Sequence, residues 1–194
     1  WNETFDLGEQ LDSLKERLAP LGWSSIDNDT VLKVLSSVCG LDPTDGDIEA
    51  LAEKIDKNPE AIAQAGNLLA LAVELLLDLG IAGPGTLPYA QALVFSARAM
   101  GAVQSQGGLS QAKRRALCAW IAEACISERF GGAPDHMVRA AWRELLQRLG
   151  LAEKPKMQAK SPKPAKECLK FSMAWARSRV TAIVLATQIG RAHV

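Results

Sequence analysis

Histidine is scarce in this sequence, which has only His136 and His193, and this limits the metal chemistry open to it. A site built from several histidines is excluded, and no cysteine or carboxylate stands at helical metal-binding spacing from His136. Ser110, Ser127 and Ser178 have no histidine base at a recognisable spacing, so nucleophilic catalysis has no support. We therefore expect no metal, no cofactor and no catalytic residue in this chain.

Aromatic residues are also few, at 5% of the 194 residues, and β-branched residues are sparse before the last apolar segment. Leu and Ala supply most of the apolar content, a mixture that favours helices over sheets. No glycine-rich phosphate-binding loop follows a strand pattern, and no repeat of solenoid period is present. The sequence predicts an all-α protein, a multi-helix bundle of about eight helices.

The four cysteines show no C-x-x-C spacing. Cys118 and Cys125 fall two turns apart on one expected helix, about 10 Å from each other, too far for a disulfide. Buried free thiols in a reducing compartment are the simplest interpretation, which predicts a cytoplasmic protein.

Long apolar runs are absent as well. The most apolar stretch, residues 68–79, is interrupted by Glu74 and Asp78 and is shorter than the ~20 residues that span a bilayer. We expect a core helix there and no membrane partner. Because the chain begins at Trp1 and shows no signal peptide, we interpret it as a fragment of a longer protein.

Capping residues and glycines divide the chain into expected helices. Asp6 should cap the first helix and Ser110 the sixth, while Asn58 with Pro59 should open the fourth. Gly101 should end the fifth helix. The first expected helix begins at Asp6, and the second follows residues 27–29 and ends near Gly40. The remaining six cover residues 47–56, 58–79, 89–100, 110–130, 135–149 and 166–188.

Aspartates cluster at residues 42–49, where a calcium-binding loop is one interpretation. Pro43 and Thr44 interrupt the ligand spacing that such a loop requires. Helix capping is therefore the better explanation of this acidic run.

Charge is sorted along the chain, although the formal net charge is zero. Residues 1–100 hold 16 acidic and 6 basic side chains, and residues 101–194 hold 6 and 16. This pattern predicts an acidic helical half at 1–80 and a basic helical half at 81–194, with a Lys/Pro loop at 151–165, or one continuous domain with both. The basic half would attract an anionic partner such as DNA, or be neutralised by the acidic half.

Basic residues recur on the outer faces of the expected later helices. Cations on one face bind phosphate by releasing counterions, which gives affinity without sequence choice. A solvated face, or one paired with the acidic half, is the alternative. The candidate phosphate-contacting residues are Lys113, Arg114, Arg115, Arg139, Arg143, Arg148, Lys166, Lys170 and Arg177.

Three motifs follow one another between Leu87 and Leu149. They are Leu87-Pro88-Tyr89, a helix centred on Trp120, and Glu128-Arg129-Phe130-Gly131-Gly132 before a capped helix. Their order resembles the carboxyl-terminal helical region of the GmrSD-type restriction endonuclease family. Phe5-Asp6-Leu7 and Leu21-Gly22-Trp23 look like its preceding helices, so the resemblance covers about three quarters of the chain.

That resemblance implies a bacterial defence protein acting on modified phage DNA. Its amino-terminal nucleotide-dependent domain carries an Asp-Gly-Gln-Gln-Arg motif, and a separate His-Asn-His-type nuclease domain is frequent. Neither motif occurs in this sequence, so no catalytic residue transfers to it. We expect a scaffold that packs against the missing amino-terminal catalytic domain and contacts DNA through the basic half. The alternative is a protein-binding module without a nucleic-acid role, which docks through the acidic half or the apolar helix at 68–77.

Overall fold

The computed structural model describes residues 6–151, and all regular structure in that range is helical. The all-α prediction is confirmed, with seven α-helices in the described residues rather than about eight. The expected helix at 166–188 and the expected loop from residue 152 lie outside the described range. The helices are α1 (Leu7–Glu16), α2 (Asn28–Val38), α3 (Ile48–Lys57), α4 (Glu60–Asp78), α5 (Ala90–Gln104), α6 (Gln111–Ile126) and α7 (Asp135–Arg148), with 3-10 turns at Ala19–Leu21 and Pro84–Thr86.

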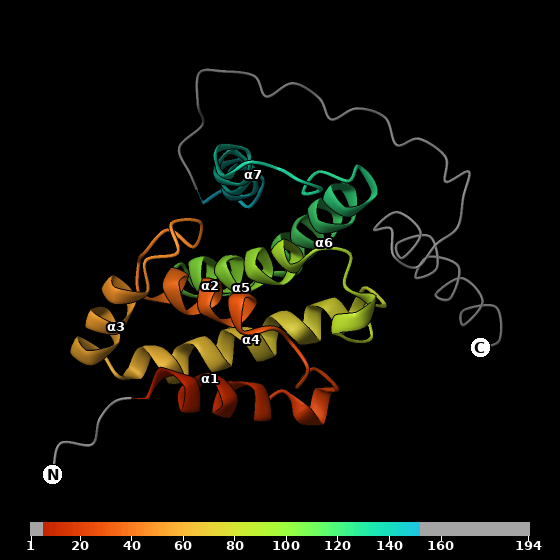
Figure 1. Ribbon diagram of the computed structural model, residues 1–194. Coiled ribbons are helices and arrows are strands. Elements are labelled where there is room, and N and C mark those ends of the chain that lie inside the picture. Colours follow the sequence, from red (N-terminus) through yellow and green to blue (C-terminus); the bar gives the residue numbers. More distant parts are fainter. Residues whose placement is uncertain (1–5, 152–194) are drawn as a thin grey trace, which may run out of the picture.

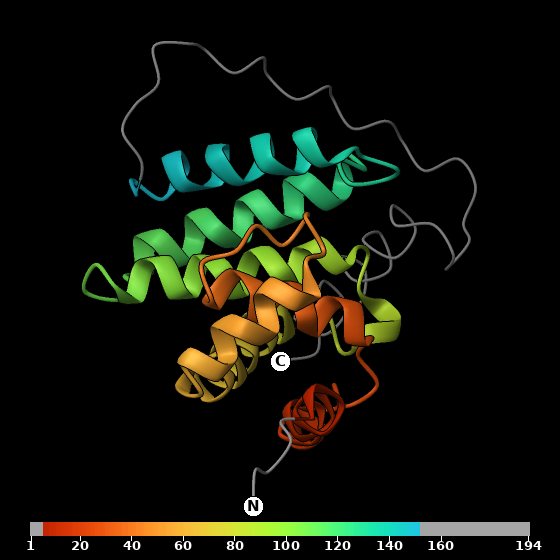
Figure 2. The ribbon, with the colours of Figure 1, turned by 60° about the vertical axis from the view of Figure 1, so that its left-hand side comes forward.

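Three helices, α2, α4 and α5, pack against one another at the centre of the bundle (Figure 1). Helix α1 lies against α2 and α4, and α3 packs on the first part of α4. On the opposite side, α6 packs on α5 and α7 packs on α6, so that α5, α6 and α7 form a stack (Figure 2). The acidic α1 and α3 and the arginine-bearing α7 therefore lie on different sides of the centre.

Side chains cap four of these helices, at the predicted Asp6 and Ser110 and at Asp27 and Asp47, which lie in the runs where capping is expected. An oxygen of each capping side chain accepts a hydrogen bond from a backbone N–H of the first turn, which is otherwise unpaired there. The pairs are Asp6 with Gly8, Asp27 with Thr30, Asp47 with Ala50 and Ser110 with Lys113. Of the acidic run, Asp47 caps α3, whereas Asp42 accepts from the N–H of Thr44 at 2.9 Å in a turn outside the helices.

Helix α4 starts without the capping side chain that the sequence predicts. The sequence predicts Asn58 as the cap, but α4 begins at Glu60 after Pro59, without a side-chain cap. Asn58 instead closes α3, where its N–H binds the carbonyl oxygens of Lys54 and Ile55. Proline fixes a helical φ without a capping side chain, which is sufficient for this start.

The predicted end of α5 at Gly101 is wrong, because the helix continues to Gln104. A Cβ at Gly101 would lie 3.1 Å from Cδ1 of Leu68, so the missing side chain lets α4 and α5 approach closely. The left-handed residues that end the helix are Gly107 and Gly108. A glycine chosen for packing and one chosen for a helix end look alike in a sequence.

Helix α6 is shorter than expected, ending at Ile126 rather than at Phe130. Glu128 adopts a left-handed conformation, with φ of 54°, and turns the chain out of the helix. Phe130 then folds back into the core, where it is 7% exposed.

One hydrophobic cluster contains side chains from Leu11 to Leu149 and spans both charge halves. Leu69 and Leu76 from α4, Phe95 from α5 and Trp120 from α6 are all buried in it. A smaller cluster of Leu35, Leu51, Ile55 and Ala65 holds α3 to α2 and α4. In the described residues the two halves thus differ in charge but share their core.

Candidate functional site

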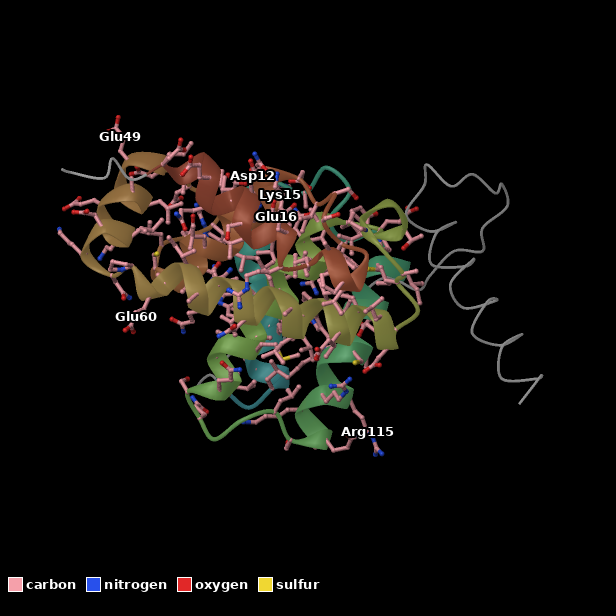
Figure 3. The ribbon with its side chains drawn as sticks, turned by 90° about the horizontal axis from the view of Figure 1, so that it is seen from below. Asp12, Lys15, Glu16, Glu49, Glu60 and Arg115 are labelled. Carbon is pink, nitrogen blue, oxygen red and sulfur yellow. The ribbon has the colours of Figure 1, made fainter. Side chains whose placement is uncertain are left out.

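Part of the acidic charge lies away from the basic start of α6, while Asp42, Asp45 and Asp78 contact arginines of α6 and α7. Asp12, Glu16 and Glu49 lie on the α1 and α3 side of the molecule, far from Arg115 on α6 (Figure 3). Residues 6–80 hold 15 acidic and 5 basic side chains, whereas residues 101–151 hold 4 and 7. Residues 101–151 therefore have an excess of three positive charges.

Three of the candidate phosphate-contacting arginines form ion pairs. Arg139 binds Asp42 through Nε at 2.8 Å and Asp45 through Nη2 at 2.6 Å. Arg148 binds Glu123 at 2.6 Å and Glu144 at 3.2 Å, and Arg114 pairs with Asp78. These ion pairs reduce the positive charge that the three side chains present to a partner.

The other three described candidates, Lys113, Arg115 and Arg143, form no ion pair with any described residue. Arg115 and Arg143 are exposed and Lys113 is half-buried. They come from the first turns of α6 and the middle of α7, two helices that pack together. Lys166, Lys170 and Arg177 lie outside the described residues.

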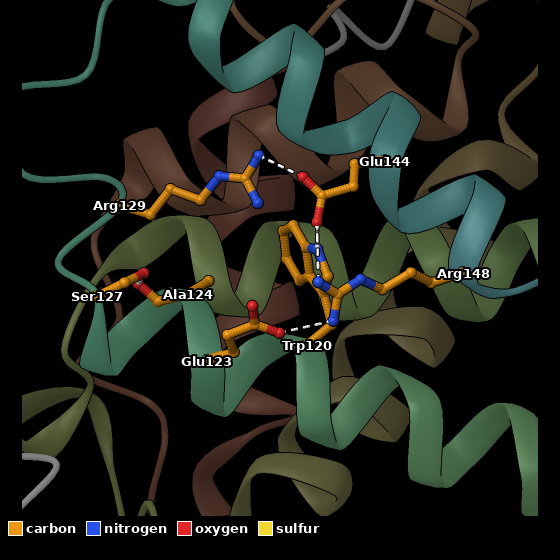
Figure 4. Close-up of polar contacts among 7 residues, drawn as sticks. All are labelled: Trp120, Glu123, Ala124, Ser127, Arg129, Glu144 and Arg148. Atoms are coloured by element: carbon orange, nitrogen blue, oxygen red, sulfur yellow. Dashed lines mark hydrogen bonds and ion pairs between the residues drawn. The ribbon is translucent and has the colours of Figure 1, made fainter. Parts of the chain in front are cut away.

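Glu144 on α7 binds three donors from α6, α7 and the turn between them (Figure 4). Its Oε2 accepts from Arg129 at 2.6 Å, and its Oε1 accepts from the indole N–H of Trp120 at 3.0 Å. Burial alone would raise the pKa of Glu144, but the hydrogen bond and charge of Arg129, with Trp120 and Arg148, bring it below its ordinary value. This arrangement joins α6 to α7 rather than exposing a carboxylate for chemistry.

Arg98 has no sequence motif around it and is missing from the predicted site residues, although it is the one charged residue in α5. Its guanidinium carbon lies 4.1 Å from the ring centroid of Trp142, a distance typical of a cation–π contact. No described residue forms a hydrogen bond or ion pair with it. Burial lowers the pKa of Arg98 to about 10, against an opposing effect of Asp42, so the side chain stays charged at neutral pH.

Two cavities adjoin Arg98 and Trp142. The larger, of about 310 Å³, lies between α2, α4, α5 and α7 and has mostly apolar walls. The smaller, of about 210 Å³, is also lined by Asp42, Arg139 and Arg143. The one signal for this region in the sequence is the lone arginine in an otherwise uncharged helix.

The cysteines and the most apolar helix take structural positions. Cys125 is buried and Cys39 and Cys118 are half-buried, all three with free thiols. No group of three His, Cys, Asp or Glu side chains in residues 6–151 is arranged to hold a metal ion. Within the same range, α4 is the one helix long and apolar enough to cross a membrane, and half of its most apolar stretch is buried in the bundle.

The residues that carry the family resemblance meet in one aromatic cluster. The rings of Tyr89 and Phe130 lie 6.0 Å apart, and those of Trp120 and Phe130 lie 6.1 Å apart. Phe95 contacts Trp120 at 5.4 Å and Trp142 at 5.9 Å. The motif residues Tyr89, Trp120 and Phe130, together with Phe95 and Trp142, hold α5, α6 and α7 together.

No protein-family model matches the chain, and no curated protein and no solved structure matches it.

Proposed function

We propose that this chain is a helical scaffold from a bacterial defence protein of the GmrSD type and that it contacts the DNA backbone through α6 and α7. The residues proposed to bind phosphate are Lys113, Arg115 and Arg143. The single observation that carries this proposal is that these three cations have no carboxylate partner in the described residues.

The motif residues support the scaffold part of the proposal. Trp120 is 1% exposed and Phe130 is 7% exposed, so both act in packing. A region that supplies a rigid surface to a separate catalytic domain needs such a core. The catalytic domain itself would lie outside this sequence, and we expect neither nuclease nor nucleotide-hydrolysing activity from the chain alone.

The ion pairs limit which cations take part. A guanidinium already bound to carboxylates must give up those bonds before it binds a phosphate, which cancels part of the gain. Arg139, with two aspartate partners, is therefore a weaker candidate than Arg143, one helical turn away. Each remaining cation that binds a phosphate adds to affinity by counterion release.

Fluorescence anisotropy with a labelled DNA duplex, at about 50 mM salt, tests this proposal. The complete chain should bind, and the variant Lys113→Ala/Arg115→Ala/Arg143→Ala should bind more weakly. The variant Lys54→Ala/Lys57→Ala removes two exposed lysines from α3 and serves as the control, with nearly unchanged affinity. Absence of binding by the wild-type chain at low salt would remove the DNA contact from the account.

The triple variant also separates two sources of positive charge. Residues 152–194 contain 9 basic and 2 acidic side chains, which would bind DNA by charge alone. If they alone bound the DNA, the triple variant would bind as tightly as the wild type. That result would contradict the proposed surface on α6 and α7.

The second candidate function is a protein-binding module that does not touch nucleic acid. The ion pairs of Arg114, Arg139 and Arg148 favour it, because they neutralise part of the basic surface. Its docking surface would be the exposed acidic side chains of α1 and α3. Leu68, Leu69, Leu75 and Leu76 are buried in the core, so the apolar helix does not offer these side chains to a partner.

Salt dependence distinguishes the two functions. DNA binding should weaken steeply as salt rises, since counterion release drives it. A protein partner that is captured equally well at low and high salt would favour the second function.

A further inference from the structure

Arg98 carries a charge for which the described residues provide only partial compensation. Its position in the middle of α5 removes part of its hydration, and burying a charge without a partner is unfavourable. The Trp142 ring compensates for some of this loss, but its π face accepts none of the five N–H donors of a guanidinium in the way that a carboxylate does.

Asp42 acts on Arg98 electrostatically, yet its carboxylate is bound to other groups. Oδ1 accepts hydrogen bonds from the N–H of Thr44 at 2.9 Å and from its hydroxyl at 2.7 Å. Oδ2 accepts from Nε of Arg139 at 2.8 Å. The guanidinium of Arg98 thus has N–H donors that no described residue accepts, and its side chain lines both cavities.

The walls of this cavity indicate what kind of molecule would complete it. Most of its lining is apolar, and Arg98 is the one charged side chain among the lining residues. Ser37 and Gln64 add polar groups, although the Ser37 hydroxyl already donates to the carbonyl oxygen of Lys33. Small-molecule sites combine apolar walls with a few polar groups in this way, and 310 Å³ lies within their usual range of ~300–1,000 Å³. The lining residues are Val34, Ser37, Val38, Gln64, Leu68, Ala97, Arg98, Gly101, Ala102 and Trp142.

We propose that the cavity between α2, α4, α5 and α7 binds a small monocarboxylate with an apolar body, the carboxylate pairing with the guanidinium of Arg98. A carboxylate fits better than a phosphate dianion because the cavity offers a single positive charge. Two parallel N–H···O bonds match the planar guanidinium, and the apolar body would lie along the walls formed by Val38, Leu68 and Ala102. The proposed DNA-contacting residues Lys113, Arg115 and Arg143 do not line this cavity, although Arg143 lines the neighbouring one.

Isothermal titration calorimetry of the complete chain with octanoate, and with octanamide as its neutral counterpart, tests the site. Octanoate should bind about tenfold more tightly, or better, because only the carboxylate forms charge-assisted hydrogen bonds with Arg98. Inorganic phosphate should bind less tightly than octanoate, since it lacks an apolar body. Equal binding of octanoate and octanamide, or no binding of octanoate, would overturn the proposal.

Variants assign the binding to this cavity. Arg98→Met keeps the length of the side chain without its charge and should reduce octanoate affinity about tenfold or more. Arg143→Met is the matched control from the neighbouring cavity and should leave the affinity unchanged. Ala102→Phe, at a partly exposed wall position, should fill the cavity and abolish binding while circular dichroism shows an intact fold.

The two arginine variants and Ala102→Phe together test whether octanoate binds in this cavity. If Arg98→Met does not fold, the loss of octanoate binding in a folded Ala102→Phe variant supports the site. Unchanged octanoate binding in a folded Arg98→Met variant, or in a folded Ala102→Phe variant, would contradict the proposed site. A loss in Arg143→Met equal to that in Arg98→Met would show a general charge effect and would also overturn the assignment.

Discussion

The indole N–H of Trp120 on α6 donates a 3.0 Å hydrogen bond to Glu144 on α7. The same carboxylate binds Arg129, which follows α6, and Arg148, one turn further along α7. Without this carboxylate each donor would lose a hydrogen-bond partner. Such a loss lowers the stability of the fold more for a half-buried group than for an exposed one. Glu144 therefore holds the α6–α7 pair in the geometry that positions Arg143 and Trp142.

Replacing Glu144 by Gln should lower the free energy of unfolding by about 1–2 kcal/mol at neutral pH. The carboxylate has a lowered pKa, so its stabilising effect is present above the ordinary pKa of glutamate and is lost as the pH falls through the lowered value. Urea unfolding of wild type and variant at neutral pH and at about pH 3 measures this difference, which should shrink in acid.

Glu123→Gln is the control for this prediction. Glu123 also binds Arg148, but its side chain is 38% exposed and solvent screens the pair. Its effect should stay within about 0.5 kcal/mol. Equal losses of stability for the two variants would show that Glu144 has no special role.

Arg139→Ala should raise the pKa of Asp42, but not all the way to the ordinary value of an aspartate. Burial raises the pKa of Asp42, while Thr44 and then Arg139 lower it to a value below the ordinary one. With Arg139 removed, both hydrogen bonds from Thr44 remain. An NMR titration of the Asp42 carboxylate in both proteins measures the change, and an unchanged pKa would show that Arg139 does not bind Asp42 in solution.

Gly66→Ala should destabilise the chain by about 1 kcal/mol, although alanine normally favours a helix. A Cβ at Gly66 would lie 2.9 Å from Cδ2 of buried Leu14, and closer still to the guanidinium of Arg17. Arg17 would have to move away from its 2.8 Å hydrogen bond to Asn67. Urea unfolding tests this against Gly85→Ala, where nothing lies within 4 Å and we expect little change. A stabilised Gly66→Ala variant would contradict the close packing of α1 on α4.

Cys125 should react with iodoacetamide at least tenfold more slowly than Cys39 at about pH 8. Burial raises the pKa of the Cys125 thiol to about 12, whereas Cys39 is half-buried and Lys54 opposes part of the rise there. Mass spectrometry of a Cys168→Ser variant follows each labelling rate separately. Similar rates at the two thiols would indicate that α6 opens readily.

Local signals in the sequence predict the helices well, because a cap involves residues only a few positions apart. Asp6 and Ser110 cap the helices expected of them, and Asp27 and Asp47 cap helices that the sequence predicts to start near these residues. Gly101 does not end its helix, and the reason for this glycine lies on another helix, in the space that Leu68 needs.

The candidate site is less predictable, because its charges depend on interactions between distant residues. Arg139 meets Asp42 across 97 positions, and no local pattern indicates that pair. The same holds for Arg98 and Trp142, since neither residue has a local signature that brings it to the other. The sequence alone therefore identifies the cations, and only the packing of the helices distinguishes the paired arginines from Lys113, Arg115 and Arg143.

The salt dependence of DNA binding tests the central claim most directly. The slope of log affinity against log salt concentration changes by about 0.9 for each phosphate that the protein no longer neutralises. We predict that Lys113→Ala/Arg115→Ala reduces the magnitude of this slope by nearly two, while Lys54→Ala/Lys57→Ala leaves it unchanged. An unchanged slope in the first variant, or equal reductions in both, would contradict a phosphate-binding surface on α6 and α7.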